Sequence, residues 1–313
     1  MTYALQAKSE LARRELGQEC CQQAEMTAFI RLGGSIELSG RRLSLQVVTS
    51  NPAVARRVFS LFKQAFSPAV PEVLVRKKIR LRKNNIYLLR LSDSPKVQAL
   101  LRQLGFLQRE TLENKATALT LDSKCCRRAY LRGAFLIAGS LSHPGNSYHL
   151  EIYTDYQEQA ENLAALMDVF GLKPKITARK NGFLVYLKES EQIGEFLNII
   201  GAHTTLMDFE NVRILKGIRN QINRLVNFET ANVNKTVEAA LKQVEAIHAL
   251  ARRPGLAALP PPLKQLAEVR LAHPEASLQE LGELLIPPLG KSGVNHRMRK
   301  LEKMARQLWT KEK

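Results

Sequence analysis

The sequence lacks any apolar run long enough to span a membrane. Its longest candidate, GAFLIAGSL at residues 133–141, is far shorter than the ~18–20 uncharged residues of a transmembrane helix. The first sixteen residues, MTYALQAKSELARREL, carry charge throughout and contain no continuous apolar stretch, which is unlike a secretory signal. We therefore expect neither a signal peptide nor a membrane partner.

Cysteine is scarce, and its spacing matches no common metal or disulfide motif. The four cysteines form two adjacent pairs, Cys20-Cys21 and Cys125-Cys126, and the six histidines are scattered. Adjacent residues on a helix point about 100° apart. We therefore interpret the cysteines as small buried apolar residues, although the equivalent positions of Cys20 and Cys125 would also let them face each other. We expect no metal, no cofactor and a reducing, cytoplasmic, nucleoid-associated location.

Acidic residues are few relative to basic ones. The 313 residues include 47 Lys and Arg against 29 Asp and Glu, which gives a formal charge of +18. Such a charge favours polyanionic partners, with nucleic acid first and an anionic membrane surface second. The sequence has no Ser-His-Asp order, Walker loop or dinucleotide fingerprint, and we expect no enzyme of those classes.

Two parts of the sequence resemble each other at an offset of 105 residues. The decamer MTAFIRLGGS (26–35) aligns with LRGAFLIAGS (131–140), and the two cysteine pairs align at the same offset. Apolar segments near the end of each part then align at an offset of 96. This ordered series indicates internal duplication, with copies at about 10–105 and 115–205.

Each copy predicts the same elements in the same order. A first helix stops at a Gly-Ser pair, and an alternating strand region, a second helix, a hairpin and a short closing helix follow. Asn84-Asn85 and Asn181-Gly182 are the turn signals of the hairpins. The helices are expected at about 10–33, 52–66, 97–105, 122–138, 156–170 and 193–201, and the hairpins at about 73–91 and 173–188. The order α-β-β-α-β-β-α, twice, predicts an α+β domain with pseudo-twofold symmetry.

The duplicated domain resembles the single-chain LAGLIDADG homing endonucleases. Four residues stand where that motif has Leu, Gly, Gly and Ser, namely Leu131, Gly133, Gly139 and Ser140. The resemblance implies that two motif helices pack side by side on the symmetry axis, which requires small residues at their contact. Ala24 and Ala28 in one copy, and Ala129 and Gly133 in the other, supply them.

The resemblance also implies an acidic residue at the end of each motif helix, where the nucleases bind a divalent cation. The matching positions hold Gly33 and Ala138, whose side chains cannot ligate a metal. Glu37 is nearby in the first copy, but its counterpart is Ser142. We therefore predict no catalytic residue and no cleavage. A nuclease with a rearranged metal site is the alternative.

A basic strand follows in each copy. From Val73 to Ser92 there are seven Lys or Arg residues and no acid. Because helices cover one face of such a sheet, we expect the basic residues on the other face, as a saddle along DNA phosphates. An ordinary solvated strand face is the alternative. The candidate saddle residues are Arg76, Lys78, Arg80, Arg82, Lys173, Lys175 and Arg179.

Residues 208–250 contain no Pro and repeat apolar residues at helical spacing, which predicts one or two helices. ARRPGLAALPPPL (251–263) predicts a hinge. A polar stripe along the helical part offers candidate DNA contacts, although a solvated face explains it equally well. Its members are Arg219, Asn223, Asn227 and Asn234.

The C-terminal segment predicts three short helices. The first covers about 262–272, the second starts at a capping box of Ser277 and Glu280, and the third runs from an N-cap at Ser292 to about 308. The apolar face of the third helix is Val294, Met298, Leu301, Ala305 and Leu308. In a helix-turn-helix the last helix enters the major groove; a generic three-helix bundle is the alternative. The candidate DNA contacts are Ser277, Gln279, Ser292, Asn295, His296, Arg297, Arg299, Lys300 and Lys303.

Two stretches, INRLVNFETANVNKTVEAA (222–240) and GKSGVNHRMRKL (290–301), are similar to the WhiA family of bacterial regulators. The resemblance implies a sequence-specific transcription factor that binds double-stranded DNA at promoters and is linked to cell division, chromosome segregation or sporulation. The expected division is a LAGLIDADG-like domain at 1–207, a linker helix and hinge at 208–260, and a helix-turn-helix domain at 261–313. An interaction protein that recruits RNA polymerase or another regulator is a further alternative.

Overall fold

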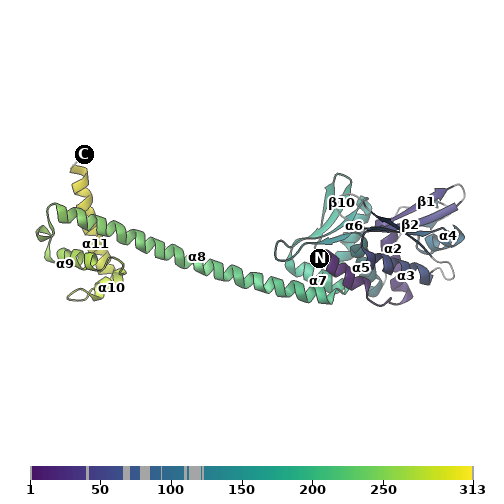
Figure 1. The fold of residues 1–313 in the computed structure, drawn as a ribbon, viewed down its shortest axis with the longest axis horizontal. Helices are drawn as coiled ribbons and strands as arrows, with labels where there is room; N and C mark the ends of the chain where they lie inside the picture. Colours follow the sequence, from purple (N-terminus) through teal and green to yellow (C-terminus); the bar gives the residue numbers. More distant parts are fainter. Residues whose placement is uncertain are drawn as a thin grey trace. The chain divides into compact units, whose positions relative to one another are not determined.

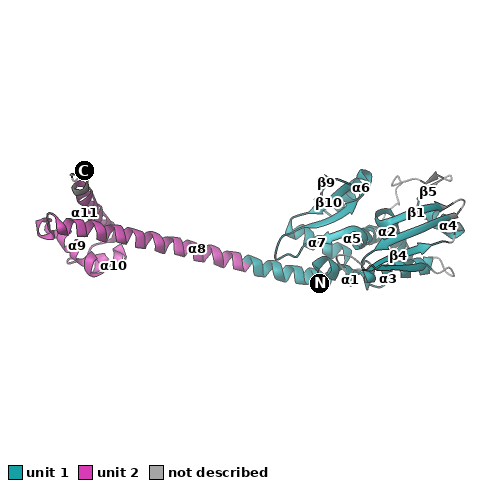
Figure 2. Ribbon diagram, turned by 45° about the horizontal axis from the view of Figure 1, so that its top comes forward, with its two compact units in different colours: residues 1–217 teal, residues 218–313 magenta. Residues whose placement is uncertain are grey.

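The structure is a computed structural model, and it describes residues 2–39, 42–65, 71–77, 85–92, 94–108, 111–112, 121 and 123–311. The chain divides into two compact units, unit 1 (Met1–Gly217) and unit 2 (Ile218–Lys313), as Figure 2 shows. Unit 1 contains helices and sheets, and the described part of unit 2 is helical. The predicted class, an α+β domain followed by a helical one, is confirmed.

Unit 1 contains the predicted order of elements in both copies (Figure 1). The first copy consists of α2 (Glu19–Gly33), β1 (Gly34–Ser39), β2 (Arg42–Thr49), α3 (Pro52–Ala65), β3 (Glu72–Lys77), β4 (Asn85–Leu91) and α4 (Ser94–Gln103). The second consists of α5 (Lys124–Ala138), β7 (Gly139–Leu141), β8 (Leu150–Thr154), α6 (Gln157–Asp168), β9 (Lys175–Arg179), β10 (Gly182–Leu187) and α7 (Ser190–Ile200). The strand orders β1-β2-β4-β3 and β7-β8-β10-β9 are equivalent, which confirms the duplication.

The first predicted helix, at about 10–33, is wrong at its start. Two helices occupy this region, α1 (Tyr3–Ala12) and α2, and residues 13–18 connect them. The apolar stripe of α1 (Tyr3, Ala7 and Leu11) is buried in the core of unit 1, where α1 packs against α3. The chain must change direction before α2 begins.

A short pair of strands, β5 (Leu107–Gln108) and β6 (Thr111–Leu112), follows α4.

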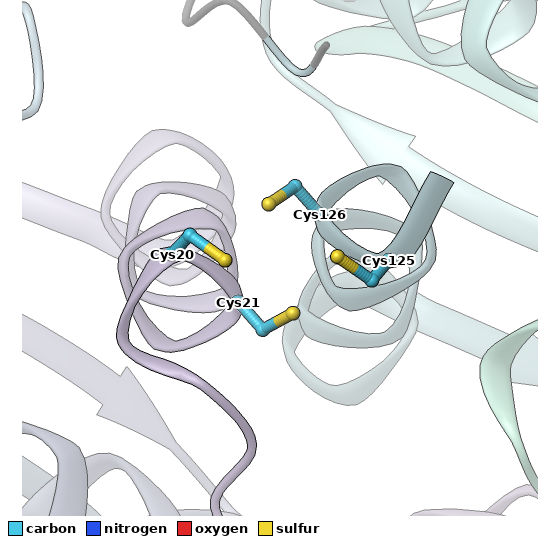
Figure 3. A group of neighbouring side chains, drawn as sticks. All are labelled: Cys20, Cys21, Cys125 and Cys126. Atoms are coloured by element: carbon cyan, nitrogen blue, oxygen red, sulfur yellow. The ribbon is translucent and has the colours of Figure 1, made fainter. Parts of the chain in front are cut away.

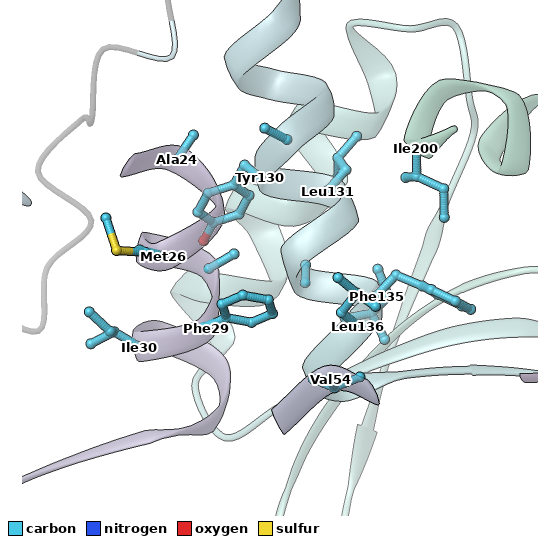
Figure 4. Packing of buried hydrophobic residues seen from close by; sticks show 14 of the residues in the cluster. Ala24, Met26, Phe29, Ile30, Val54, Tyr130, Leu131, Phe135, Leu136 and Ile200 are labelled. Carbon is cyan, nitrogen blue, oxygen red and sulfur yellow. The ribbon is translucent and has the colours of Figure 1, made fainter. Parts of the chain in front are cut away.

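The two motif helices, α2 and α5, pack against each other through the predicted small residues (Figure 4). Ala24, Ala28 and Ala129 are fully buried. A Cβ atom at Gly133 would lie 2.8 Å from the carbonyl oxygen of Glu25 and 2.9 Å from Cβ of Ala28. Larger residues would therefore force the helices apart.

A buried ion-pair network crosses the same contact. The Glu25 carboxylate in α2 pairs with the Arg57 guanidinium of α3 and lies 3.2 Å from Nε of Arg132 in α5. Arg57 also donates to the carbonyl oxygen of Arg14 (2.6 Å). This network joins three helices and satisfies charges that burial would otherwise penalise.

Each four-stranded sheet turns one face to the helices and the other away from them. The helix-facing residues are fully buried, namely Leu45, Val47, Leu89, Leu150, Ile152 and Val185. Their neighbours along each strand point to the opposite face. We call this opposite face the outer face of each sheet.

A single helix, α8 (His203–Arg252), occupies the region where one or two helices were expected, and the boundary between the units falls within it. In unit 2 it is followed by η1 (Leu256–Ala258), α9 (Pro261–Ala272), α10 (Leu278–Glu283) and α11 (Lys291–Lys311). The segment expected as a hinge, 251–263, connects α8 to α9 inside unit 2. Its Leu259 and Leu263 are buried in the same core as Leu250 of α8 and Leu266 of α9.

Candidate nucleic-acid interface

The helices α9, α10 and α11 form the predicted three-helix arrangement, and local hydrogen bonds fix their turns. The Ser277 hydroxyl accepts a hydrogen bond from the Glu280 backbone N–H (3.3 Å), and the Glu280 carboxylate accepts one from the Ser277 N–H (2.6 Å). The predicted capping box is therefore present. These bonds lower the pKa of the Glu280 carboxyl. Ser277 thus has a capping role, and its neighbour Gln279 is exposed.

Buried Arg270 ties the turn between α9 and α10 to α8. Its guanidinium donates to the carbonyl oxygen of Ala276 (2.5 Å) and to Oε1 of Gln243 in α8 (2.6 Å). Burial lowers the pKa of this guanidinium, and the oxygen acceptors offset part of the desolvation. The residue supports the position of the turn without facing solvent.

The longer turn, residues 284–290, folds back on the end of α10. The Leu289 N–H donates to the carbonyl oxygen of Gly282 (2.9 Å). A Cβ atom at Gly282 would lie 2.0 Å from the carbonyl oxygen of Leu289, and one at Gly293 would lie 2.7 Å from Cγ of Leu289. The two glycines let the turn pack closely, and the turn sets where α11 begins.

The helix α11 separates an apolar face from an exposed basic one. Val294, Met298, Leu301 and Ala305 are buried, so the predicted apolar face is confirmed over the residues whose side chains are described. The exposed face consists of Ser292, His296, Arg299, Lys300 and Lys303, and the partly buried Asn295 and Arg297 lie beside it. Of the candidate contacts on α11, Asn295 is thus less exposed than Lys300.

The N-cap assigned to Ser292 is wrong. The helix begins at Lys291, and the carbonyl oxygen of Gly290 accepts the first hydrogen bond, from the Val294 N–H (3.1 Å). Ser292 therefore lies in the first turn of α11 with its side chain exposed.

Basic residues dominate the first part of α11. Residues 291–303 contain five Lys or Arg residues and a single acid, Glu302. In the described part of the chain, Arg299, Lys300 and Lys303 form no salt bridge. Exposed guanidinium and ammonium groups of this kind suit phosphate oxygens and the acceptor edge of guanine.

The polar stripe on α8 lies on a fully exposed stretch, residues 217–239. Its members Arg219, Asn223, Asn227 and Asn234 are all exposed. Apolar residues on the same stretch are exposed as well, with Ile222 at 54% and Val233 at 60%. The stripe is therefore not the outer side of a packed helix.

The saddle residues are placed as expected where the structure describes them. Lys175 and Arg179 lie on the outer face of β9, and Ile176 lies on the opposite face. Arg76 lies on the outer face of β3. Lys173 precedes β9 and is exposed. Three further candidates lie outside the described residues, namely Lys78, Arg80 and Arg82. The same holds for Asn84 of the Asn84-Asn85 turn signal.

The outer faces carry acidic and apolar side chains beside the basic ones. On the first sheet, Glu72 pairs across the strands with Arg90, and Val48 and Leu74 are 44% and 53% exposed. On the second sheet, the Glu151 carboxylate contacts Nε2 of His149 (3.0 Å). Acidic and apolar side chains thus interrupt the basic ones, because side chains from neighbouring strands share each face.

The ends of the motif helices hold no carboxylate at the two matching positions. Gly33 and Ala138 are the last residues of α2 and α5. A Cβ atom at residue 33 would lie 2.3 Å from Cγ1 of Ile137, so an apolar side chain fills this position. The nearby Glu37 carboxylate accepts a hydrogen bond from Nε2 of Gln46 (2.6 Å).

Potential metal ligands gather at the other end of the helix pair. The sulfur atoms of Cys20, Cys21, Cys125 and Cys126 all lie within 4.8 Å of one another. The interpretation of these cysteines as buried apolar residues is wrong for Cys20 and Cys125, which are exposed. The signal that could have found this cluster is the alignment of one pair on the other at the repeat offset.

The cysteine environment differs between positions. The pKa of the Cys125 thiol is lowered to about 7, chiefly because the Ser123 hydroxyl lies 3.2 Å from its sulfur. Burial raises the pKa of the Cys21 thiol to about 12 and also raises that of Cys126.

No helix in the described part of the chain combines the length and the apolar character needed to cross a membrane.

Comparison with known families and relatives covers nearly the whole chain. Three family models match, described as WhiA N-terminal LAGLIDADG-like domain (19–107), WhiA LAGLIDADG-like domain (127–219) and WhiA C-terminal HTH domain (222–305). A probable cell division protein WhiA of Desulforamulus reducens is 51% identical over 312 residues, or 98% of this chain and 96% of that protein. Its counterpart in Bacillus velezensis is 46% identical over 313 residues, or 99% and 98%.

Solved structures show the same architecture. The crystal structure of full-length DUF199/WhiA from Thermatoga maritima is 26% identical and has a TM-score of 0.58, covering 98% of this chain and 99% of that one. The N-terminal LAGLIDADG domain of DUF199/WhiA, 24% identical with a TM-score of 0.52, covers 64% of this chain and 90% of that one. It shows the fold of unit 1.

Proposed function

The chain belongs to the WhiA family, and on that premise we propose that it is a sequence-specific transcriptional regulator of cell-division genes. The observation that carries this proposal is the exposed basic face of α11 at the end of a helix-turn-helix domain. The first turns of α11 enter the major groove, where Asn295 and Arg299 read base edges and Lys300 and Lys303 hold phosphates.

The experiment is capture of fragmented genomic DNA by the full-length protein at a fixed salt concentration, followed by footprinting of the enriched fragments. A regulator of this kind enriches a common sequence located in promoters, and its footprint includes that sequence. Capture that follows only fragment length or charge would contradict sequence-specific binding, because phosphate contacts alone carry no sequence information.

We propose further that unit 1 binds without cleaving DNA. The two helix ends carry Gly33 and Ala138, and Ile137 packs where a side chain of residue 33 would project. A divalent cation that activates water requires oxygen ligands, which these residues do not offer through their side chains. Incubation of supercoiled DNA with the protein and Mg²⁺ or Mn²⁺ tests this. Nicking that is lost on substitution of Glu37 would identify a rearranged site and contradict the proposal.

The two sheets of unit 1 favour different partners. Lys175 and Arg179 on the second sheet suit DNA phosphates, whereas the exposed Val48 and Leu74 on the first sheet suit a protein. We propose that the first sheet contacts RNA polymerase or another regulator. A pull-down that measures capture of RNA polymerase by the Leu74→Lys variant tests this. The Thr177→Lys variant, changed on the second sheet, is the matched control. Equal capture by both variants would contradict the assignment.

A further inference from the structure

The cysteine cluster joins the two copies of the repeat at the N-terminal ends of their motif helices. Figure 3 shows Cys20 and Cys21 on α2 and Cys125 and Cys126 on α5, with their sulfur atoms pointing into the space between the helices. The four sulfur atoms lie within 4.8 Å of one another. The cluster lies at the opposite end of the helix pair from Gly33 and Ala138.

The spacing suits a single tetrahedral ion. With metal–sulfur bonds of about 2.3 Å, a tetrahedron of four thiolates places its sulfur atoms about 3.8 Å apart. The observed upper limit of 4.8 Å can close to that value by small rotations of the side chains. In a cluster of several iron atoms, each cysteine would bind a different iron, so the four cysteine sulfur atoms would lie farther apart. A set of four sulfur ligands selects Zn²⁺ among common divalent cations.

The local charges favour the thiolate form that a metal needs. The cysteines are the second and third residues of α2 and α5, where the positive end of the helix dipole stabilises negative charge. One Zn²⁺ ion with four thiolates carries a net charge of −2. Lys124, Arg127 and Arg128 are basic neighbours of the second pair in the sequence of α5.

We propose that Cys20, Cys21, Cys125 and Cys126 together bind one Zn²⁺ ion, which joins the N-terminal ends of α2 and α5. Binding displaces the protons of the thiols, which pass to solvent, and involves no change of oxidation state. Each helix has 15 residues, or about 22 Å at 1.5 Å per residue. The site therefore lies far from Gly33 and Ala138, and its role is to hold the two copies of the repeat in register.

The test uses the full-length, tag-free protein, reduced and stripped of metal with a chelator. Titration with Co²⁺ is expected to give the intense visible bands of tetrahedral thiolate coordination at one ion per chain, and Zn²⁺ is expected to displace Co²⁺ stoichiometrically. Cys125→Ser removes one ligand at an exposed position and so should keep the fold. It is expected to lose stoichiometric binding and the tetrahedral spectrum. The matched control Glu19→Gln changes an exposed neighbour of Cys20 and should retain both.

A second measurement follows the thermal midpoint of the same proteins with and without Zn²⁺. Zinc should raise the midpoint of the wild type and of Glu19→Gln and leave that of Cys125→Ser unchanged. The proposal is overturned if the reduced wild type binds no stoichiometric metal, or if Cys125→Ser binds it equally well. Formation of disulfides between α2 and α5 in a protein that takes up no zinc would also overturn it.

Discussion

Gly33 at the end of α2 lies against Ile137 of α5, and a Cβ atom at residue 33 would come within 2.3 Å of Cγ1 of Ile137. The LAGLIDADG nucleases that the sequence resembles carry an acid at this position of the motif. Here the two helix ends meet through an apolar side chain instead. The position has become a packing contact between the two copies of the repeat.

A side chain at residue 33 should therefore destabilise unit 1. Gly33→Ala is expected to lower the free energy of unfolding by about 1–3 kcal/mol, the usual effect of overpacking. Ile137→Ala should relieve that loss in a double-mutant cycle. Hydrogen exchange of α2 and α5 peptides across a urea series measures the change. Gly217→Ala on an exposed stretch of α8, where an added Cβ meets nothing within 4 Å, is the control. Equal effects of Gly33→Ala with and without Ile137 would contradict the packing argument.

The Glu25 network predicts a larger effect at the centre of the helix pair. Glu25→Gln leaves the buried Arg57 guanidinium without its charge partner, so a loss of about 3–5 kcal/mol in the free energy of unfolding is expected. Glu19→Gln, on the same helix but exposed, should change it by less than about 0.5 kcal/mol. Urea denaturation of the two variants measures the difference. Similar midpoints for both would show that the network contributes little.

The start of α8 predicts a pH-dependent effect within unit 1. The Glu10 carboxylate accepts hydrogen bonds from the N–H groups of Thr204 (2.7 Å) and Thr205 (2.9 Å) and so caps this helix. Burial opposes ionisation, but the bonds from Thr205 and Thr204 outweigh it and lower the pKa of Glu10 below 4.5. A lowered carboxyl pKa stabilises the fold above the unfolded value, and the stabilisation is lost as pH falls through the folded pKa.

Glu10→Ala should accordingly lower the free energy of unfolding by about 1–2 kcal/mol at neutral pH, as the loss of a helix cap does. The difference from the wild type should shrink as pH falls below 4.5. Thermal unfolding of both proteins between about pH 3 and 7, a range that includes the ordinary carboxyl pKa of ~4, measures it. A difference that is constant across this range would contradict a charged cap.

The second sheet predicts a change in salt dependence. If Lys175 and Arg179 contact phosphates, the double variant Lys175→Ala/Arg179→Ala should reduce the slope of log K against log salt by about 1.8, or ~0.9 per contact. Binding to specific and non-specific duplexes should weaken alike. Thr177→Ala, between them on the same face, is the control. Fluorescence anisotropy at several salt concentrations measures the slopes, and an unchanged slope would remove this face from the interface.

The repeat, the order of its elements, the small residues between α2 and α5, and the Ser277–Glu280 capping box could all be predicted from the sequence. The repeat is visible as an alignment of the sequence with itself at an offset of 105 residues. The other features rest on local patterns: periodicity, a Gly-Ser stop or a spacing of three or four residues. The break between α1 and α2 could not, because the packing of Tyr3, Ala7 and Leu11 into the core, which no local pattern shows, sets the direction of α1.

The site was predicted less completely for a related reason. The exposed face of α11 follows from helical periodicity alone. The mixed outer faces depend on which strands lie side by side, as Glu72 and Arg90 do. The cysteine cluster depends on two helices about 105 residues apart in the sequence meeting at the same end. Only the packing of α2 on α5 brings those thiols together.

The central claim, that α11 reads bases, is tested most directly by a ratio of two dissociation constants. The full-length protein is titrated into a captured promoter duplex and into a scrambled duplex at one salt concentration. The wild type is expected to prefer the promoter by at least about 10³-fold. Asn295→Ala/Arg299→Ala is expected to lose most of that preference while still binding both duplexes, at about 1–3 kcal/mol per lost base contact. A double variant that keeps the wild-type ratio would show that another part of the protein recognises the sequence.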